Sequence, residues 1–115
     1  MNIQIVDKSI TINEIKAIGQ EFFDEMAKAV VDIEKGIMAV GGELHADAMD
    51  VLVKAGSNPE NVWGINIYFD KPREEWIEYN SLMNVKPSQG NRSLDVESPE
   101  IREKIKEVVK KLING

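Results

Sequence analysis

The chain has 115 residues, and its 20 acidic and 14 basic side chains give a net charge of -6. It is 43% apolar and has no cysteine, which excludes a disordered chain, a disulfide framework, a thiolate metal site and a cysteine nucleophile. No apolar run approaches the roughly 18–20 residues that cross a bilayer. We therefore expect a single globular domain over residues 1–115 that is soluble and cytoplasmic and has no membrane partner.

All of the excess negative charge lies in residues 20–50. This segment holds eight acids against Lys28 and Lys35, whereas the charges in the rest of the chain cancel. An acidic surface repels a phosphate backbone, so nucleic acid is not an expected partner. A solvated face that keeps the protein soluble is one interpretation of this segment. Docking of a partner protein or of a second copy of the chain is the alternative.

The chain begins with the patterns of a strand and a helix. Ile3 and Ile5 alternate with polar residues, as in a half-buried strand. Thr11 and Glu14 then fit a capping box, which predicts a helix over about residues 12–25.

A hairpin and a second helix follow. Residues 29–34 alternate in polarity, residues 37–40 are apolar, and the Lys-Gly dipeptide between them fits a tight turn because glycine tolerates positive φ. After the Gly-Gly dipeptide 41–42, the spacing of apolar residues changes from that of a strand to that of a helix. A stripe of apolar residues that begins at Leu44 then predicts a helix over 44–55.

The second half predicts two strands, a long loop and a third helix. Residues 62–69 alternate with one strongly apolar face, and residues 76–85 form the next strand. Residues 84–97 show neither the helical nor the strand spacing of apolar residues. Residues 98–113 open with Ser-Pro-Glu, a favourable helix start, and carry the clearest amphipathic stripe in the chain.

The predicted elements follow one another in the order β-α-β-β-α-β-β-α. Hairpins imply antiparallel neighbours, and each helix has one apolar stripe to bury. The sequence therefore predicts an α+β fold, a two-layer sandwich in which three helices pack on one face of about five mostly antiparallel strands.

Three segments resemble a known family. They are residues 41–48 (GGELHADA), 63–68 (WGINIY) and 86–93 (KPSQGNRS). Together they resemble a small prokaryotic family described only as a domain of unknown function, and the similarity runs from the first strand to the last helix. The resemblance implies a cytoplasmic prokaryotic protein, and it implies no activity, substrate or catalytic residue.

His45 is the one histidine and the one side chain whose ordinary pKa suits acid–base work near neutrality. On a strand, Glu43, His45 and Asp47 would share one face and could hold a metal ion, but on a helix His45 turns away from the others. The helical period favours the second geometry, so His45 is a candidate catalytic residue and no metal is expected. Glu43, Asp47 and Asp50 form a carboxylate stripe that could hold Mg²⁺ or Ca²⁺. Alternatively, these acids bind no metal and only stabilise the positive N-terminal end of the helix.

The dipeptide Gly41-Gly42 lies between a predicted strand and a predicted helix, where phosphate-binding turns occur. The segment lacks the G-x-G-x-x-G and G-x-x-x-x-G-K-S/T motifs. A sharp turn is therefore the simpler interpretation, and the sequence predicts no cofactor.

The loop 84–97 is the main candidate for ligand binding, because long aperiodic loops in compact domains are often functional. Its stretch 86–93 carries a net charge of +2 with no acid. The guanidinium of Arg92 suits a carboxylate or a phosphate. The alternatives are that these side chains satisfy the loop's own backbone or that Arg92 pairs with the acidic segment. The expected ligand-binding residues are Lys86, Ser88, Gln89, Asn91 and Arg92.

Two functions of different classes follow from these patterns. The first is a small soluble protein, with or without enzyme activity, that binds an anionic small molecule through the loop 86–93. The second is a non-catalytic module for protein–protein or homo-oligomeric interaction through the acidic segment and an exposed part of the sheet.

Overall fold

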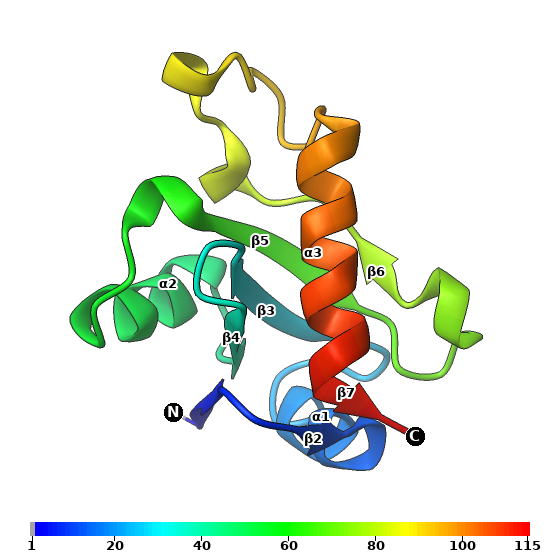
Figure 1. The fold of residues 1–115 in the computed structure, drawn as a ribbon. Helices are drawn as coiled ribbons and strands as arrows, with labels where there is room; N and C mark the ends of the chain where they lie inside the picture. Colours follow the sequence, from blue (N-terminus) through cyan, green and yellow to red (C-terminus); the bar gives the residue numbers. More distant parts are fainter. Residues whose placement is uncertain (1) are drawn as a thin grey trace.

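The computed structural model of the protein describes residues 2–115 (Figure 1). Its main feature is a five-stranded antiparallel sheet in the order β1-β4-β3-β5-β6. The strands are β1 (Ile3–Val6), β3 (Ala27–Asp32), β4 (Ile37–Gly41), β5 (Val62–Ile67) and β6 (Ile77–Glu78). A short parallel pair, β2 (Ile10–Thr11) and β7 (Ile113–Asn114), ties the two ends of the chain together.

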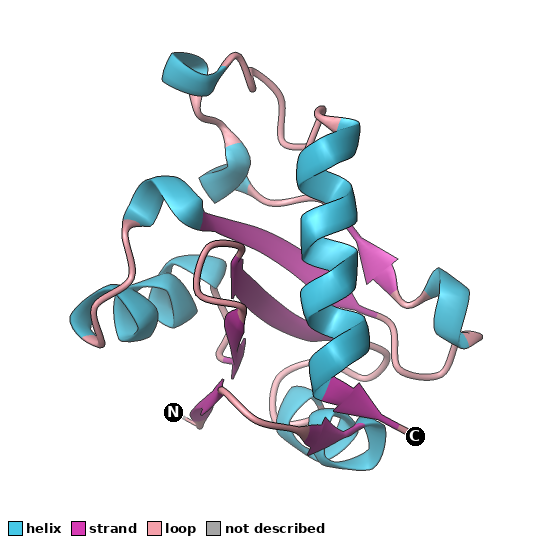
Figure 2. Ribbon diagram, in the orientation of Figure 1, coloured by secondary structure: helices cyan, strands magenta, loops and turns pink. Residues whose placement is uncertain are grey.

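The structure has three α-helices (Figure 2), namely α1 (Ile12–Gly19), α2 (His45–Lys54) and α3 (Pro99–Leu112). Over residues 2–115, no helix combines the length and the apolar character that crossing a membrane requires. The capping box at Thr11 and Glu14 forms as predicted, and the Ser98 hydroxyl accepts a hydrogen bond from the backbone of Ile101. The predicted α+β class with a five-stranded antiparallel sheet is confirmed.

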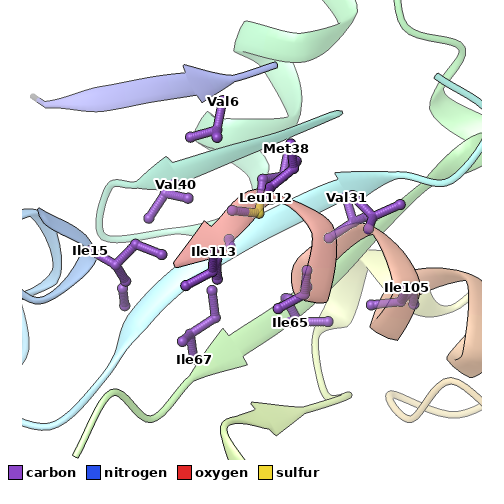
Figure 3. Packing of buried hydrophobic residues seen from close by; sticks show 14 of the residues in the cluster. Val6, Ile15, Val31, Met38, Val40, Ile65, Ile67, Ile105, Leu112 and Ile113 are labelled. Atoms are coloured by element: carbon purple, nitrogen blue, oxygen red, sulfur yellow. The ribbon is translucent and has the colours of Figure 1, made fainter. Parts of the chain in front are cut away.

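The layering differs from the expectation that all helices lie on one face. One face of the sheet packs on α1 and α3, and Figure 3 shows Val31 and Ile65 beside Ile105 and Leu112 there. The other face packs on α2. This smaller cluster contains Val30, Ala39, Ala48, Leu52 and Val62. The reason lies in β5, which is buried at all six positions and therefore needs cover on both faces.

Two predicted elements are shorter than expected. Helix α1 ends at Gly19 instead of continuing to about residue 25, because the returning chain passes close by. A Cβ atom at Gly19 would lie 2.8 Å from the carbonyl oxygen of Met26. The strand predicted over 76–85 is reduced to β6, and residues 82–84 form a 3₁₀ turn instead.

Asn84 holds the irregular segment 81–97 against the sheet, and Asn91 connects different parts of the segment to one another. The Asn84 amide accepts a hydrogen bond from the backbone N–H of Gly64 at 2.7 Å and donates one to its carbonyl at 2.9 Å. The Asn91 amide donates to the carbonyls of Asn84 at 2.7 Å and Asp95 at 2.8 Å. Side-chain amides thus replace the strand pairing that the sequence pattern predicted here.

Candidate functional site

A cavity of about 400 Å³ lies beside the start of α2, over the part of the sheet that this helix leaves open. Lys28 of β3 and Asn66 of β5 contribute from the sheet, where they face each other across the two strands. The cavity is lined by Met26, Lys28, Leu44, His45, Ala46, Asn66, Asn80, Ser81, Leu82, Met83 and Leu94.

The first turn of α2 forms one wall of this cavity. The chain leaves β4 through Gly41 and Gly42, which have φ values of 117° and 85°. Leu44 then takes the N-cap position, and no side chain caps the helix. The first N–H groups of a helix have no partner within the helix, and they form its positive end. His45 and Ala46, whose backbone N–H groups have no capping side chain, are among the residues that line the cavity.

His45 occupies a buried position of α2, which corrects the predicted apolar stripe. The buried face of the helix consists of His45, Ala48 and Leu52, whereas Leu44 is 56% exposed. The His45 Nε2 atom lies 2.8 Å from the carbonyl oxygen of Ile65, to which it donates as an N–H group. This hydrogen bond fixes the ring at the junction between α2 and β5.

Burial lowers the pKa of His45 from its ordinary value of 6.5, and the positive charge of Lys28 acts in the same direction. The hydrogen bond to Ile65, the nearby side chain of Asn66 and the charge of Glu78 oppose this shift. The neutral imidazole is therefore the favoured form in the folded protein at neutral pH.

This lowered pKa makes the stability of the protein depend on pH. Below pH 6.5 the unfolded chain binds a proton at His45 more readily than the folded chain, so the free energy of unfolding falls as the pH drops. We expect His45→Gln, which keeps a donor for Ile65, to have a weaker pH dependence than the wild type between pH 7.5 and 5.5. Urea unfolding across this range measures the difference, and parallel curves for the two proteins would contradict it.

Asn66 is the polar residue at this site that the sequence reasoning missed. Its side chain is 7% exposed, and its amide nitrogen donates to Glu78 at 2.7 Å and to the Asn80 carbonyl at 3.4 Å. Its Oδ1 atom is enclosed and has no hydrogen-bond partner among residues 2–115. The signal that could have found Asn66 is a lone amide in the middle of a strand with no exposed position.

The cavity has one positive lining residue among those described, Lys28, and the carboxylate of Glu78 lies next to the cavity, 2.7 Å from the amide nitrogen of Asn66. Among the described residues that line the cavity, Lys28 is the one side chain with a full charge, and no carboxylate is present. The Lys28 ammonium also lies 5.4 Å from the centre of the Phe23 ring. Together with the uncapped start of α2, Lys28 makes this cavity favourable for an anion, although the protein as a whole is acidic.

The loop 86–93 uses three of its five predicted ligand-binding side chains for internal hydrogen bonds. The Lys86 ammonium donates to the carbonyl of Pro59 at 3.0 Å and lies over the Trp63 ring. Gln89 donates to the carbonyl of Glu60 at 2.9 Å, and Asn91 is buried within the loop. Asn91 thus satisfies the loop's own backbone, as the alternative interpretation expects, whereas Lys86 and Gln89 bind the loop to the segment before β5.

Ser88 and Arg92 are exposed, and over residues 2–115 neither side chain makes a hydrogen bond or an ion pair. Glu97 closes the loop because its carboxylate accepts hydrogen bonds from Ser93 and from the backbone of Arg92, which lowers the pKa of Glu97. No residue of 86–93 lines the cavity beside His45. The structure therefore does not bring the loop and His45 together in one cavity.

The predicted carboxylate stripe does not form on one helix face. Glu43 precedes α2, which begins at His45, so Glu43 and Asp47 are not stacked one turn apart. Asp50 instead forms an ion pair with Lys54 at 2.9 Å. Over the part of the chain that the structure describes, no group of three histidine or carboxylate side chains is placed to hold a metal ion.

Comparison with known proteins gives one match. Residues 4–112 match the family DUF5674, whose description is "Protein of unknown function". No curated protein and no solved structure matches the chain. The match covers β1 from Gln4 onward, the other four strands of the sheet, the three α-helices and the loop 86–93. The chain therefore belongs to the DUF5674 family.

Proposed function

We propose that this protein binds a small anionic molecule in the cavity at the start of α2. The observation that carries the proposal is the uncapped first turn of α2, which opens beside Lys28 into a cavity without a lining carboxylate. Backbone N–H groups at a helix N-terminus and a nearby lysine are a common way to hold an anion. A leucine is among the poorest N-cap residues, so helix stability alone does not account for Leu44 at this position.

Within the described chain, Asn66 adds an unpaired polar atom to the same cavity. A buried polar atom without a partner costs roughly 1–3 kcal/mol, and such atoms are rare in folded proteins. The enclosed Oδ1 atom of Asn66 is one of them, and its residue lines the same cavity. An anionic oxygen cannot donate a hydrogen bond to this atom, so a water or a separate donor group on the ligand would have to remove the cost. The volume of about 400 Å³ also falls within the range of small-molecule sites, roughly 300–1,000 Å³.

The loop 86–93 provides the second candidate site for the anion. Ser88 and the guanidinium of Arg92 point to solvent and are not used within the described chain. An interaction module remains the candidate function of another class, because exposed leucines surround the cavity. We expect the protein to act in the cytoplasm of a prokaryote, as the family resemblance implies.

Removing the charge of Lys28 tests the proposed site. We expect Lys28→Met to weaken binding of the anion at least tenfold, since a hydrogen bond to a charged group contributes about 1.5–3 kcal/mol. A thermal-shift panel of small carboxylates and phosphates identifies a binding anion, and isothermal titration calorimetry then measures its affinity.

Two variants serve as controls. Lys54→Met removes an exposed lysine that pairs with Asp50, away from the cavity, and is expected to leave the affinity unchanged. Arg92→Ala tests the loop. Retained binding in Lys28→Met together with lost binding in Arg92→Ala would move the site to the loop 86–93.

A further inference from the structure

Exposed leucines concentrate around the proposed anion site. Among residues 2–115, six large apolar side chains are exposed, and three of them line this one cavity. Leu82 is 80% exposed, Leu44 56% and Leu94 40%. Single exposed leucines are ordinary, but a cluster around a polar cavity marks a surface that something covers.

The most exposed of these side chains has no visible structural role. Leu82 belongs to neither apolar cluster of the fold. Its 3₁₀ turn is held instead by Ser81, whose hydroxyl accepts a hydrogen bond from the backbone of Met83, and by the buried Asn84. Leu82 is therefore free to contact a molecule that binds in or over the cavity.

The cavity thus has two chemically different parts. Lys28 and the start of α2 form a positive part at the sheet. The three leucines and the flexible side chains of Met26 and Met83 form an apolar part around it. Methionine adapts to apolar groups of varied shape, which suits a site for an alkyl chain.

We infer that the ligand is a monocarboxylate with an aliphatic arm. Its carboxylate binds at the start of α2 beside Lys28, and its arm lies between Leu44, Leu82 and Leu94. One lysine and one helix end match one negative charge better than the two charges of a phosphate. This inference rests on the proposed function, and it adds the class of ligand.

A homologous series of carboxylates tests the inference on the intact protein. We expect calorimetry to show tighter binding from acetate through butyrate and hexanoate to octanoate. Burial of one methylene contributes about 0.8 kcal/mol, which corresponds to roughly fourfold in affinity for each methylene that the leucines cover. We expect Leu82→Ser to weaken hexanoate binding several-fold and to leave acetate binding unchanged. Val85→Ser, a nearby exposed residue outside the cavity, is the matched control.

Other results of these binding experiments would overturn specific parts of the proposal. Equal affinity along the series would overturn the aliphatic arm and leave the anion site standing. Equal octanoate binding by the wild type and by Leu82→Ser would place the arm elsewhere and also overturn the inference. Failure of every carboxylate to bind would overturn the inference, and failure of the phosphates as well would overturn the anion site that the proposed function states. In that case, a dimer seen by light scattering and lost in Leu82→Ser would assign the leucines to an interface between copies of the chain.

Discussion

Replacement of Asn84 by alanine is expected to lower the free energy of unfolding by about 3 kcal/mol. The Asn84 amide is fully buried and pairs with both backbone groups of Gly64 in β5, and it also donates to the carbonyl of Leu94 at 3.2 Å. Alanine leaves these groups buried without partners, and each such group costs roughly 1–3 kcal/mol. Urea unfolding followed by tryptophan fluorescence measures the loss.

Asn61→Ala is the matched control for this prediction. The Asn61 amide donates to Glu34 at 2.7 Å at the protein surface, where water can replace the lost partner. We expect this variant to lose about 1 kcal/mol or less. Similar losses in the two variants would show that the Asn84 amide does not hold the segment 81–97 on the sheet.

Gly41→Ala is expected to destabilise the protein by at least about 3 kcal/mol. Gly41 has a φ of 117°, and a Cβ atom there would lie 2.2 Å from the carbonyl oxygen of Asn2 and 2.9 Å from the Ile18 side chain. Backbone strain of this kind costs about 1–3 kcal/mol, and the clash adds to it because β1 must move away from β4. Because Gly41 directs the chain toward α2, we also expect weaker anion binding in this variant.

Gly36→Ala separates the strain from the clash. Gly36 also has a positive φ, 69°, but a Cβ atom there would meet nothing within 4 Å. We expect it to lose about 1–2 kcal/mol from the left-handed conformation alone. Comparable unfolding free energies for the two alanine variants would contradict the role assigned to the contact between Gly41 and Asn2.

The sequence predicts those parts of the fold that depend on local patterns. The hairpin of β3 and β4, the helix α3 and the capping box at Thr11 all follow from periodicity and from residues at fixed spacing. The cover on both faces of the sheet was not predicted, because an apolar run in one strand does not show which helix packs on which face.

The strand predicted over 76–85 shows where local pattern is insufficient. Its alternation of apolar and polar residues is real, but only β6 pairs with β5. Beyond it, the Asn84 side chain takes up the backbone groups of Gly64, and a Cβ atom at Gly64 would lie 2.7 Å from Ser81. Such contacts between distant residues leave no periodic signal in the sequence.

The candidate site depends on one detail of register at the start of α2. The sequence pattern begins the apolar stripe at Leu44, whereas the structure makes Leu44 the exposed N-cap and buries His45. Helix ends are the least certain part of any pattern-based prediction. The loop 86–93 has the composition of an anion site, but hydrogen bonds to the carbonyls of Pro59 and Glu60 already use two of its donors.

An NMR titration of the ¹⁵N-labelled protein with hexanoate locates the bound anion on the chain, because each backbone amide reports separately. If the anion binds at the start of α2, we expect the backbone amide signals of His45 and Ala46 and the side-chain amide signal of Asn66 to shift as hexanoate is added. We expect the backbone amide signals of Ser88 to Arg92 to stay unchanged. Shifts confined to the loop 86–93, with His45 and Ala46 unchanged, would contradict the claim that the start of α2 binds the anion.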